Sequence, residues 1–109
     1  MRILFDQGTP APLRRALSAH RVETAYERGW SSFENGELIS PAEAAGFDVL
    51  VTTDRNLKYQ QSLIDRSLSI AVLSSTSWPR IQRALSQVVA AVDAATPGGY
   101  QEVTVENAL

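Results

Sequence analysis

The stretch FDVLVTTD, residues 47–54, decides the fold class of this chain. Its centre, Asp48–Thr52, is rich in valine and leucine, which is typical of a parallel strand buried on both faces of a sheet. This segment ends in Thr52, and Thr53 and Asp54 follow it. The stretch therefore predicts a central parallel strand that ends in a polar tip.

Working outward, predicted strands alternate with predicted helices along the whole chain. The other expected strands are Arg2–Phe5, Val22–Tyr26, Leu68–Leu73 and an edge strand Tyr100–Val105. The expected helices run from Thr9 to Arg21, Asn35 to Gly46, Asn56 to Ile64 (a weak pattern) and Pro79 to Ala95. This alternation predicts an α/β fold around a mainly parallel five-stranded sheet.

One helix contains a conflict in its sequence. Ser40-Pro41-Ala42-Glu43 has the pattern of a helix start, with a capping serine, a proline in the first turn and a capping-box glutamate. The segment is therefore either one helix capped by Asn35 or a short turn over Asn35–Ile39 followed by a second piece from Pro41.

Composition limits the classes of function. The 109 residues suggest one domain, residues 1–109, and 44% hydrophobic residues allow a real core. The lack of cysteine excludes thiol catalysis and disulfides, and a single histidine argues against a multi-histidine zinc site. A net charge of -2 argues against a strongly electropositive nucleic-acid binder. No apolar run reaches membrane-spanning length and no signal peptide is evident, so we expect a cytoplasmic protein without a membrane partner.

Carboxylates follow two of the predicted strands. Asp6 comes directly after Ile3-Leu4-Phe5, and Asp54 comes two residues after Thr52. Parallel strands deliver such residues to one edge of the sheet, and Glu37, near a helix start, is a natural third acid there. Two or three converging oxygen ligands suit Mg²⁺ or Mn²⁺. The alternative is that both aspartates are ordinary turn and cap residues, and the residues alone leave both interpretations open.

The order of several motifs resembles the small bacterial PIN-like proteins, a family of largely unknown function that is related to PIN-domain ribonucleases and to toxins of toxin–antitoxin pairs. The matching motifs are MRILFD (1–6), PLRRAL (12–17), GELI (36–39) and VLVTTDRNL (49–57). The resemblance implies a three-layer α/β/α sandwich with an acidic metal site. It makes Asp6, Glu37 and Asp54 the catalytic and metal-binding carboxylates, with Thr52 supporting the site through its hydroxyl.

The function implied by the resemblance is metal-dependent hydrolysis of RNA phosphodiester bonds. Mg²⁺ or Mn²⁺ would activate a water, and Arg55 and Lys58 would contact the RNA phosphates. A toxin would have an antitoxin protein as a partner. The apolar stripe along Ile81–Val92 is expected in the core, and its extension into a homodimer interface stays open.

Two departures from the family pattern support another function. Asn56 stands where PIN nucleases commonly carry a further aspartate; its amide can support the site as a ligand or by a hydrogen bond, but it holds a second cation less well. Gln7 follows Asp6 where the family often has glutamate. The second hypothesis is therefore a catalytically weak or inactive module that binds RNA or a protein partner. A third, a phosphatase-like or receiver-like protein that uses Asp6 or Asp54 covalently, is disfavoured because neither strand is followed by an Asp-x-Asp pair.

Overall fold

A computed structural model describes residues 1–55, 57 and 66–105 of the chain. Within them, five strands form one sheet in the order β2-β1-β3-β4-β5, and every neighbouring pair is parallel. The strands are β1 (Arg2–Phe5), β2 (Arg21–Thr24), β3 (Val49–Thr52), β4 (Ser69–Leu73) and β5 (Tyr100–Val103). The predicted α/β class and the parallel sheet are thus confirmed, and each strand lies within two residues of its predicted bounds.

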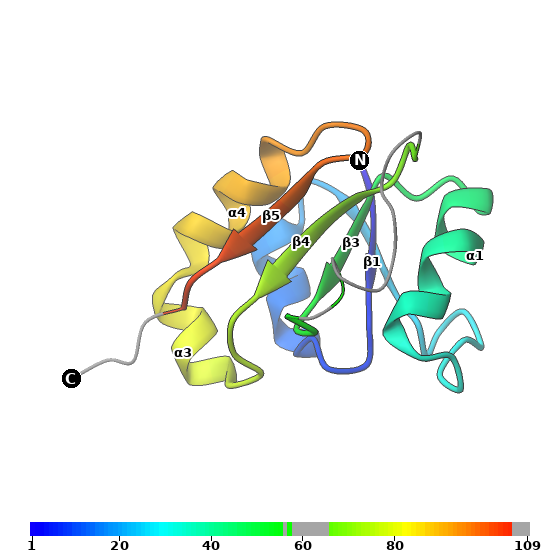
Figure 1. The fold of residues 1–109 in the computed structure, drawn as a ribbon. Coiled ribbons are helices and arrows are strands. Elements are labelled where there is room, and N and C mark those ends of the chain that lie inside the picture. Colours follow the sequence, from blue (N-terminus) through cyan, green and yellow to red (C-terminus); the bar gives the residue numbers. More distant parts are fainter. Residues whose placement is uncertain (56, 58–65, 106–109) are drawn as a thin grey trace.

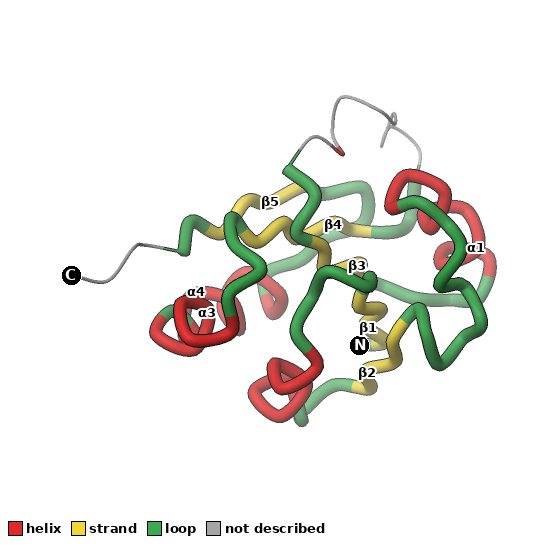
Figure 2. Tube along the Cα trace, turned by 90° about the horizontal axis from the view of Figure 1, so that it is seen from below, coloured by secondary structure: helices red, strands yellow, loops and turns green. Residues whose placement is uncertain are grey.

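The sheet buries a separate apolar core on each face. Alternate strand residues point to opposite faces, so Phe5 and Val51 join one core while Leu4 and Leu50 join the other. The first core packs under the 3₁₀ helix η1 (Ala11–Leu17) and under α3 (Trp78–Arg83) and α4 (Leu85–Asp93). The second packs under η2 (Asn35–Leu38) and α1 (Ile39–Ala44). Figures 1 and 2 show α1 on the opposite side of the sheet from α3 and α4.

The helix predicted first along the chain is shorter than expected, and it is a 3₁₀ helix and not an α-helix. The segment predicted to be helical from Thr9 to Arg21 forms only η1, a 3₁₀ helix. The Leu13 N–H donates to the Pro10 carbonyl, three residues back, at 3.1 Å, which is the hydrogen-bond spacing of a 3₁₀ helix.

The segment around Pro41 is broken into two pieces. η2 ends at Leu38 and α1 begins at Ile39, which places Pro41 in the first turn of α1, where a missing N–H is tolerated. The expected caps were wrong, because Glu34 rather than Asn35 precedes η2, and Leu38 rather than Ser40 precedes α1.

The long helix predicted over Pro79–Ala95 is divided into α3 and α4 at Ala84. No local sequence signal marks this break, since alanine is the best helix former. Ile81, Val88 and Val92 are all buried in the first core, as expected for the stripe, so tertiary packing overrides local propensity here. The helix predicted over Asn56–Ile64 lies outside the described residues, apart from Leu57.

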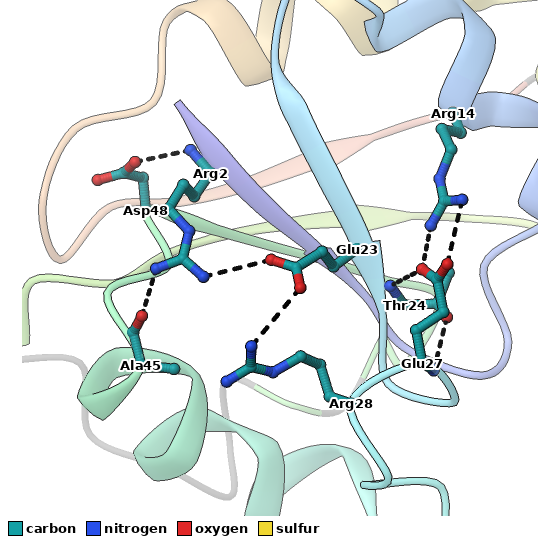
Figure 3. Close-up of polar contacts among 8 residues, drawn as sticks. All are labelled: Arg2, Arg14, Glu23, Thr24, Glu27, Arg28, Ala45 and Asp48. Atoms are coloured by element: carbon teal, nitrogen blue, oxygen red, sulfur yellow. Dashed lines mark hydrogen bonds and ion pairs between the residues drawn. The ribbon is translucent and has the colours of Figure 1, made fainter.

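Charged side chains connect neighbouring elements near the amino edge of the sheet (Figure 3). The Arg2 guanidinium donates to the Ala45 carbonyl and pairs with Glu23, which also pairs with Arg28 at 3.5 Å. The Arg2 and Arg28 guanidinium groups also lie over the Phe47 ring, 4.5 and 5.5 Å from its centre. These charges therefore have a structural role.

Among the described helices, none has the length and apolar character required to cross a bilayer.

Candidate functional site

Successive strands are added to one side of β1 first and then to the other, so the strand order changes direction between β1 and β3. From β1 the chain crosses to β2 through η1 on the first-core face, whereas Leu57, which follows β3, is buried in the second core. The two strands are nevertheless direct neighbours, with Phe5 opposite Val51. In open parallel sheets, this reversal leaves a crevice outside the carboxyl ends of the two strands, where ligands bind. Figure 2 views the molecule from that edge.

Asp6 follows β1 at this reversal and is only 2% exposed. Its Oδ1 accepts hydrogen bonds from the backbone N–H of Thr9 at 3.0 Å and from the Thr9 hydroxyl at 2.6 Å. Its Oδ2 accepts one from the Thr52 hydroxyl at 2.5 Å. A buried carboxylate needs such partners, so the two threonines hold Asp6 in one orientation.

Thr52 connects Asp6 to Asp54. Its hydroxyl donates to Asp6 and accepts a hydrogen bond from the backbone N–H of Asp54 at 3.0 Å. The Asp54 residue is half-buried and lines a cleft of about 400 Å³ at the carboxyl edge. Asp6, Thr52 and Asp54 therefore form one connected group at the ends of two adjacent strands.

This cleft is called the acidic cleft below, because two of the described residues that line it, Glu34 and Asp54, are carboxylates. The described residues that line it are Gln7, Gly8, Ala25, Phe33, Glu34, Leu38 and Asp54. Glu34 thus occupies the wall where the sequence suggested Glu37. Glu37 is exposed, and its carboxylate accepts a hydrogen bond from the backbone N–H of Glu34 at 2.9 Å, which caps η2.

Of the remaining predicted residues, the structure describes Arg55 alone. Arg55 is exposed in the turn after Asp54. Asn56 and Lys58, predicted to support the site and to contact phosphate, lie outside the described residues.

The residues present suit a single hard cation better than a dedicated cage. A carboxylate offers about four lone-pair sites. The contacts to Thr9 and Thr52 occupy three of them on Asp6, which leaves one on Oδ2 beside the Thr52 hydroxyl. Mg²⁺ is usually held by one or two carboxylates plus waters and substrate phosphates, and Asp6 and Asp54 are two carboxylate residues joined through Thr52 at the ends of adjacent strands. In the part of the chain that the structure describes, no group of three or more histidine, cysteine, aspartate or glutamate residues could hold a metal ion.

Sequence reasoning missed Thr9 and Glu34. The signal for Thr9 was its position three residues after Asp6, because aspartate side chains commonly accept hydrogen bonds from nearby backbone groups in turns. Gly8, which lies between Asp6 and Thr9 in the sequence, permits a close approach to the loop after β3, since a Cβ there would lie 2.5 Å from the Thr53 Oγ1. No sequence signal placed Glu34 in the acidic cleft, because its position depends on the break between η2 and α1.

In comparisons with protein-family models, curated proteins and solved structures, no match to this chain was found. The functional argument therefore starts from the geometry of the carboxyl edge.

Proposed function

We propose that this chain is a metal-dependent ribonuclease of the PIN-like type, acting in the cytoplasm as a toxin with an antitoxin protein as its partner. The observation that supports the proposal best is the connected group Asp6, Thr52 and Asp54 at the reversal point of a parallel sheet, beside the acidic cleft. This is the place where open α/β sheets bind their ligands.

Asp6 and Asp54 would hold Mg²⁺ or Mn²⁺, which when bound supplies an activated water and offsets negative charge on a phosphodiester. Thr9 and Thr52 fix the Asp6 carboxylate before substrate arrives, which lowers the reorganisation needed at the site. Glu34, which lines the same cleft as Asp54, would accept a hydrogen bond from the attacking water. The exposed Arg55 would contact the phosphate backbone.

Cleavage of single-stranded RNA in the presence of Mg²⁺ or Mn²⁺ tests this function. Asp54→Asn should abolish cleavage while the fold is retained, since its side chain is only half-buried. Asp48→Asn is the matched control, because that aspartate is exposed at the opposite edge, where its carboxylate accepts a hydrogen bond from the Arg2 N–H at 2.8 Å. Equal cleavage by both variants, or no cleavage by the wild type with either metal, would reject the proposal.

The two glutamates can be separated in the same assay. Glu34→Gln should lower the cleavage rate more than Glu37→Gln, because Glu34 lines the cleft and Glu37 caps η2. A larger loss of cleavage rate in Glu37→Gln than in Glu34→Gln would instead assign the catalytic role to Glu37, as the resemblance implied.

A binding module without catalysis is the second candidate, and one observation favours it. The Asp6 carboxylate already accepts three hydrogen bonds from Thr9 and Thr52, as a purely structural aspartate would. The melting temperature during a Mn²⁺ titration distinguishes the two functions. A ligand that binds only the folded state stabilises it by about 2.7 kcal/mol at 100 times its Kd. An unchanged melting temperature at millimolar Mn²⁺ would favour the module.

A further inference from the structure

Exposed aromatic residues gather around the carboxyl edge. Among the described residues, the exposed large hydrophobic side chains are Met1, Tyr26 and Phe33. Phe33 lines the acidic cleft, and Tyr26, 79% exposed, lines a second cavity of about 690 Å³. Both exposed aromatic residues of the described part of the chain thus line hollows at this edge.

The second cavity, called the aromatic cavity below, opens on the first-core side of Asp6. Its walls come from the loops after β1 and β4, the end of β2 with the turn that follows it, and the start of α3, and include Gln7, Thr9, Thr24, Tyr26, Thr76 and Trp78. It therefore combines two aromatic residues from different elements with three threonines and a glutamine, whose amide N–H donates to the Ser31 carbonyl at 2.8 Å. Gln7 and Gly8 line both this cavity and the acidic cleft, so the two hollows are neighbours.

The turn that carries Tyr26 is held in place by a set of polar contacts (Figure 3). The Thr24 N–H donates to the Glu27 carboxylate at 2.9 Å, and the Glu27 N–H donates back to the Thr24 hydroxyl at 3.1 Å. Arg14 pairs with the same carboxylate, and Gly29 completes the turn with a φ of 75°. An exposed ring on a fixed turn loses little freedom on binding, so it is well prepared to contact a ligand.

The charge of the aromatic cavity selects the kind of ligand. Among the described residues that line it, none is cationic, and the one carboxylate is Asp6, whose oxygens accept hydrogen bonds from threonines. Such a cavity disfavours a phosphate group. A flat, neutral ring with hydrogen-bonding edges matches it, because aromatic side chains stack on the faces of bases while hydroxyls and amides contact their edges.

We propose that the aromatic cavity is a binding subsite for one unpaired nucleobase, stacked against Tyr26 and contacted by Trp78. This rests on the proposed nuclease function and deepens it, because a base held here would place the adjoining phosphodiester beside the acidic cleft. Thr24, Thr76 and Gln7 then read the edge of the base, so the subsite sets which nucleotide is preferred next to the cleaved bond.

Tryptophan fluorescence tests the subsite without any metal. The chain has two tryptophans, and Trp30→Phe leaves Trp78 as the reporter inside the cavity. In this background, uridine, cytidine, adenosine and guanosine are titrated separately. At least one nucleoside should change the emission of Trp78 saturably. Tyr26→Ala should weaken its Kd by about 5- to 150-fold, the range for loss of one stacking partner.

Two variants make the result specific to the cavity. Tyr26→Phe, which keeps the ring, should retain most of the affinity. Phe33→Ala, which removes the exposed ring of the neighbouring cleft, should leave the nucleoside Kd unchanged. No response to any nucleoside at millimolar concentration, or a Kd that is unaffected by Tyr26→Ala, would overturn the inference. Saturable binding of inorganic phosphate in place of nucleosides would overturn it as well.

The outcomes separate this subsite from the proposed function. RNA cleavage that requires Asp54, together with no nucleoside binding, rejects the subsite alone. Nucleoside binding that depends on Tyr26, together with no cleavage under either metal, supports the subsite and rejects the nuclease.

Discussion

Replacing Thr52 by valine tests the connected group at its centre. Thr52 is 0% exposed, and valine has nearly the same shape, so the change removes a hydroxyl without opening a cavity. The Asp6 carboxylate, 2% exposed, then loses the only donor to its Oδ2 among the described residues. Hydrogen bonds to charged groups contribute roughly 1.5–3 kcal/mol, so we expect the free energy of unfolding to fall by about 2 kcal/mol. Loss of the hydrogen bond from the Asp54 N–H adds little, because that bond is only partly buried.

Urea denaturation measures this loss. With a typical slope of about 1–3 kcal/mol per molar urea, the unfolding midpoint should fall by roughly 1 M. Thr53→Val is the matched control, since this neighbouring threonine donates no hydrogen bond to the described residues and is half-buried. Its effect should stay within about 0.5 kcal/mol, as for most substitutions away from such contacts. If both variants change stability equally, the Asp6–Thr52 hydrogen bond does not stabilise the site.

Two further substitutions test other contacts: Glu43→Gln, away from the acidic cleft, and Gly8→Ala, in its lining. Glu43 has a pKa below its ordinary value of 4.5, chiefly because the Ser67 N–H donates to it. A lowered folded-state pKa stabilises the fold above the unfolded pKa, and this is lost as the pH falls. Glu43→Gln should therefore be less stable than wild type at pH 7 in urea denaturation, and the difference should shrink below pH 4.5; a constant difference would contradict this. Gly8→Ala places a Cβ 2.5 Å from the Thr53 Oγ1 and should cost about 1 kcal/mol by overpacking. Adding Thr53→Ala should recover most of that loss, and no recovery would refute the clash.

Strand positions could be predicted because burial on both faces of a parallel sheet leaves a direct mark in the sequence. Val49, Leu50 and Val51 alternate between the two cores, so these three consecutive residues are all apolar. The break near Pro41 could also be anticipated, since it follows from a missing N–H. The break at Ala84 could not, because it depends on how α3 and α4 pack on the sheet.

The site was only partly predictable for the same reason. Asp6 and Asp54 follow apolar strands in the sequence, but their connection through Thr52 depends on β1 and β3 being neighbours. Local sequence could not assign Glu34 to the cleft wall in place of Glu37, because the capping contact of η2 turns Glu37 to the backbone of Glu34. The spacing of Thr9 from Asp6 carried the signal of a turn with a backbone contact, but no sequence signal indicated the second hydrogen bond, from the Thr9 hydroxyl.

Direct measurement of Mn²⁺ binding tests the central claim, that Asp6 and Asp54 form a divalent-cation site. Free Mn²⁺ gives an electron paramagnetic resonance signal that decreases when the ion binds protein, so the bound fraction is read without any RNA. The wild type should bind about one Mn²⁺ per chain, as expected for a site of one or two carboxylates. Asp54→Asn should lose this binding while it remains folded, and Asp48→Asn should retain it. No bound Mn²⁺ at millimolar concentration, or equal binding by Asp54→Asn, would contradict the account.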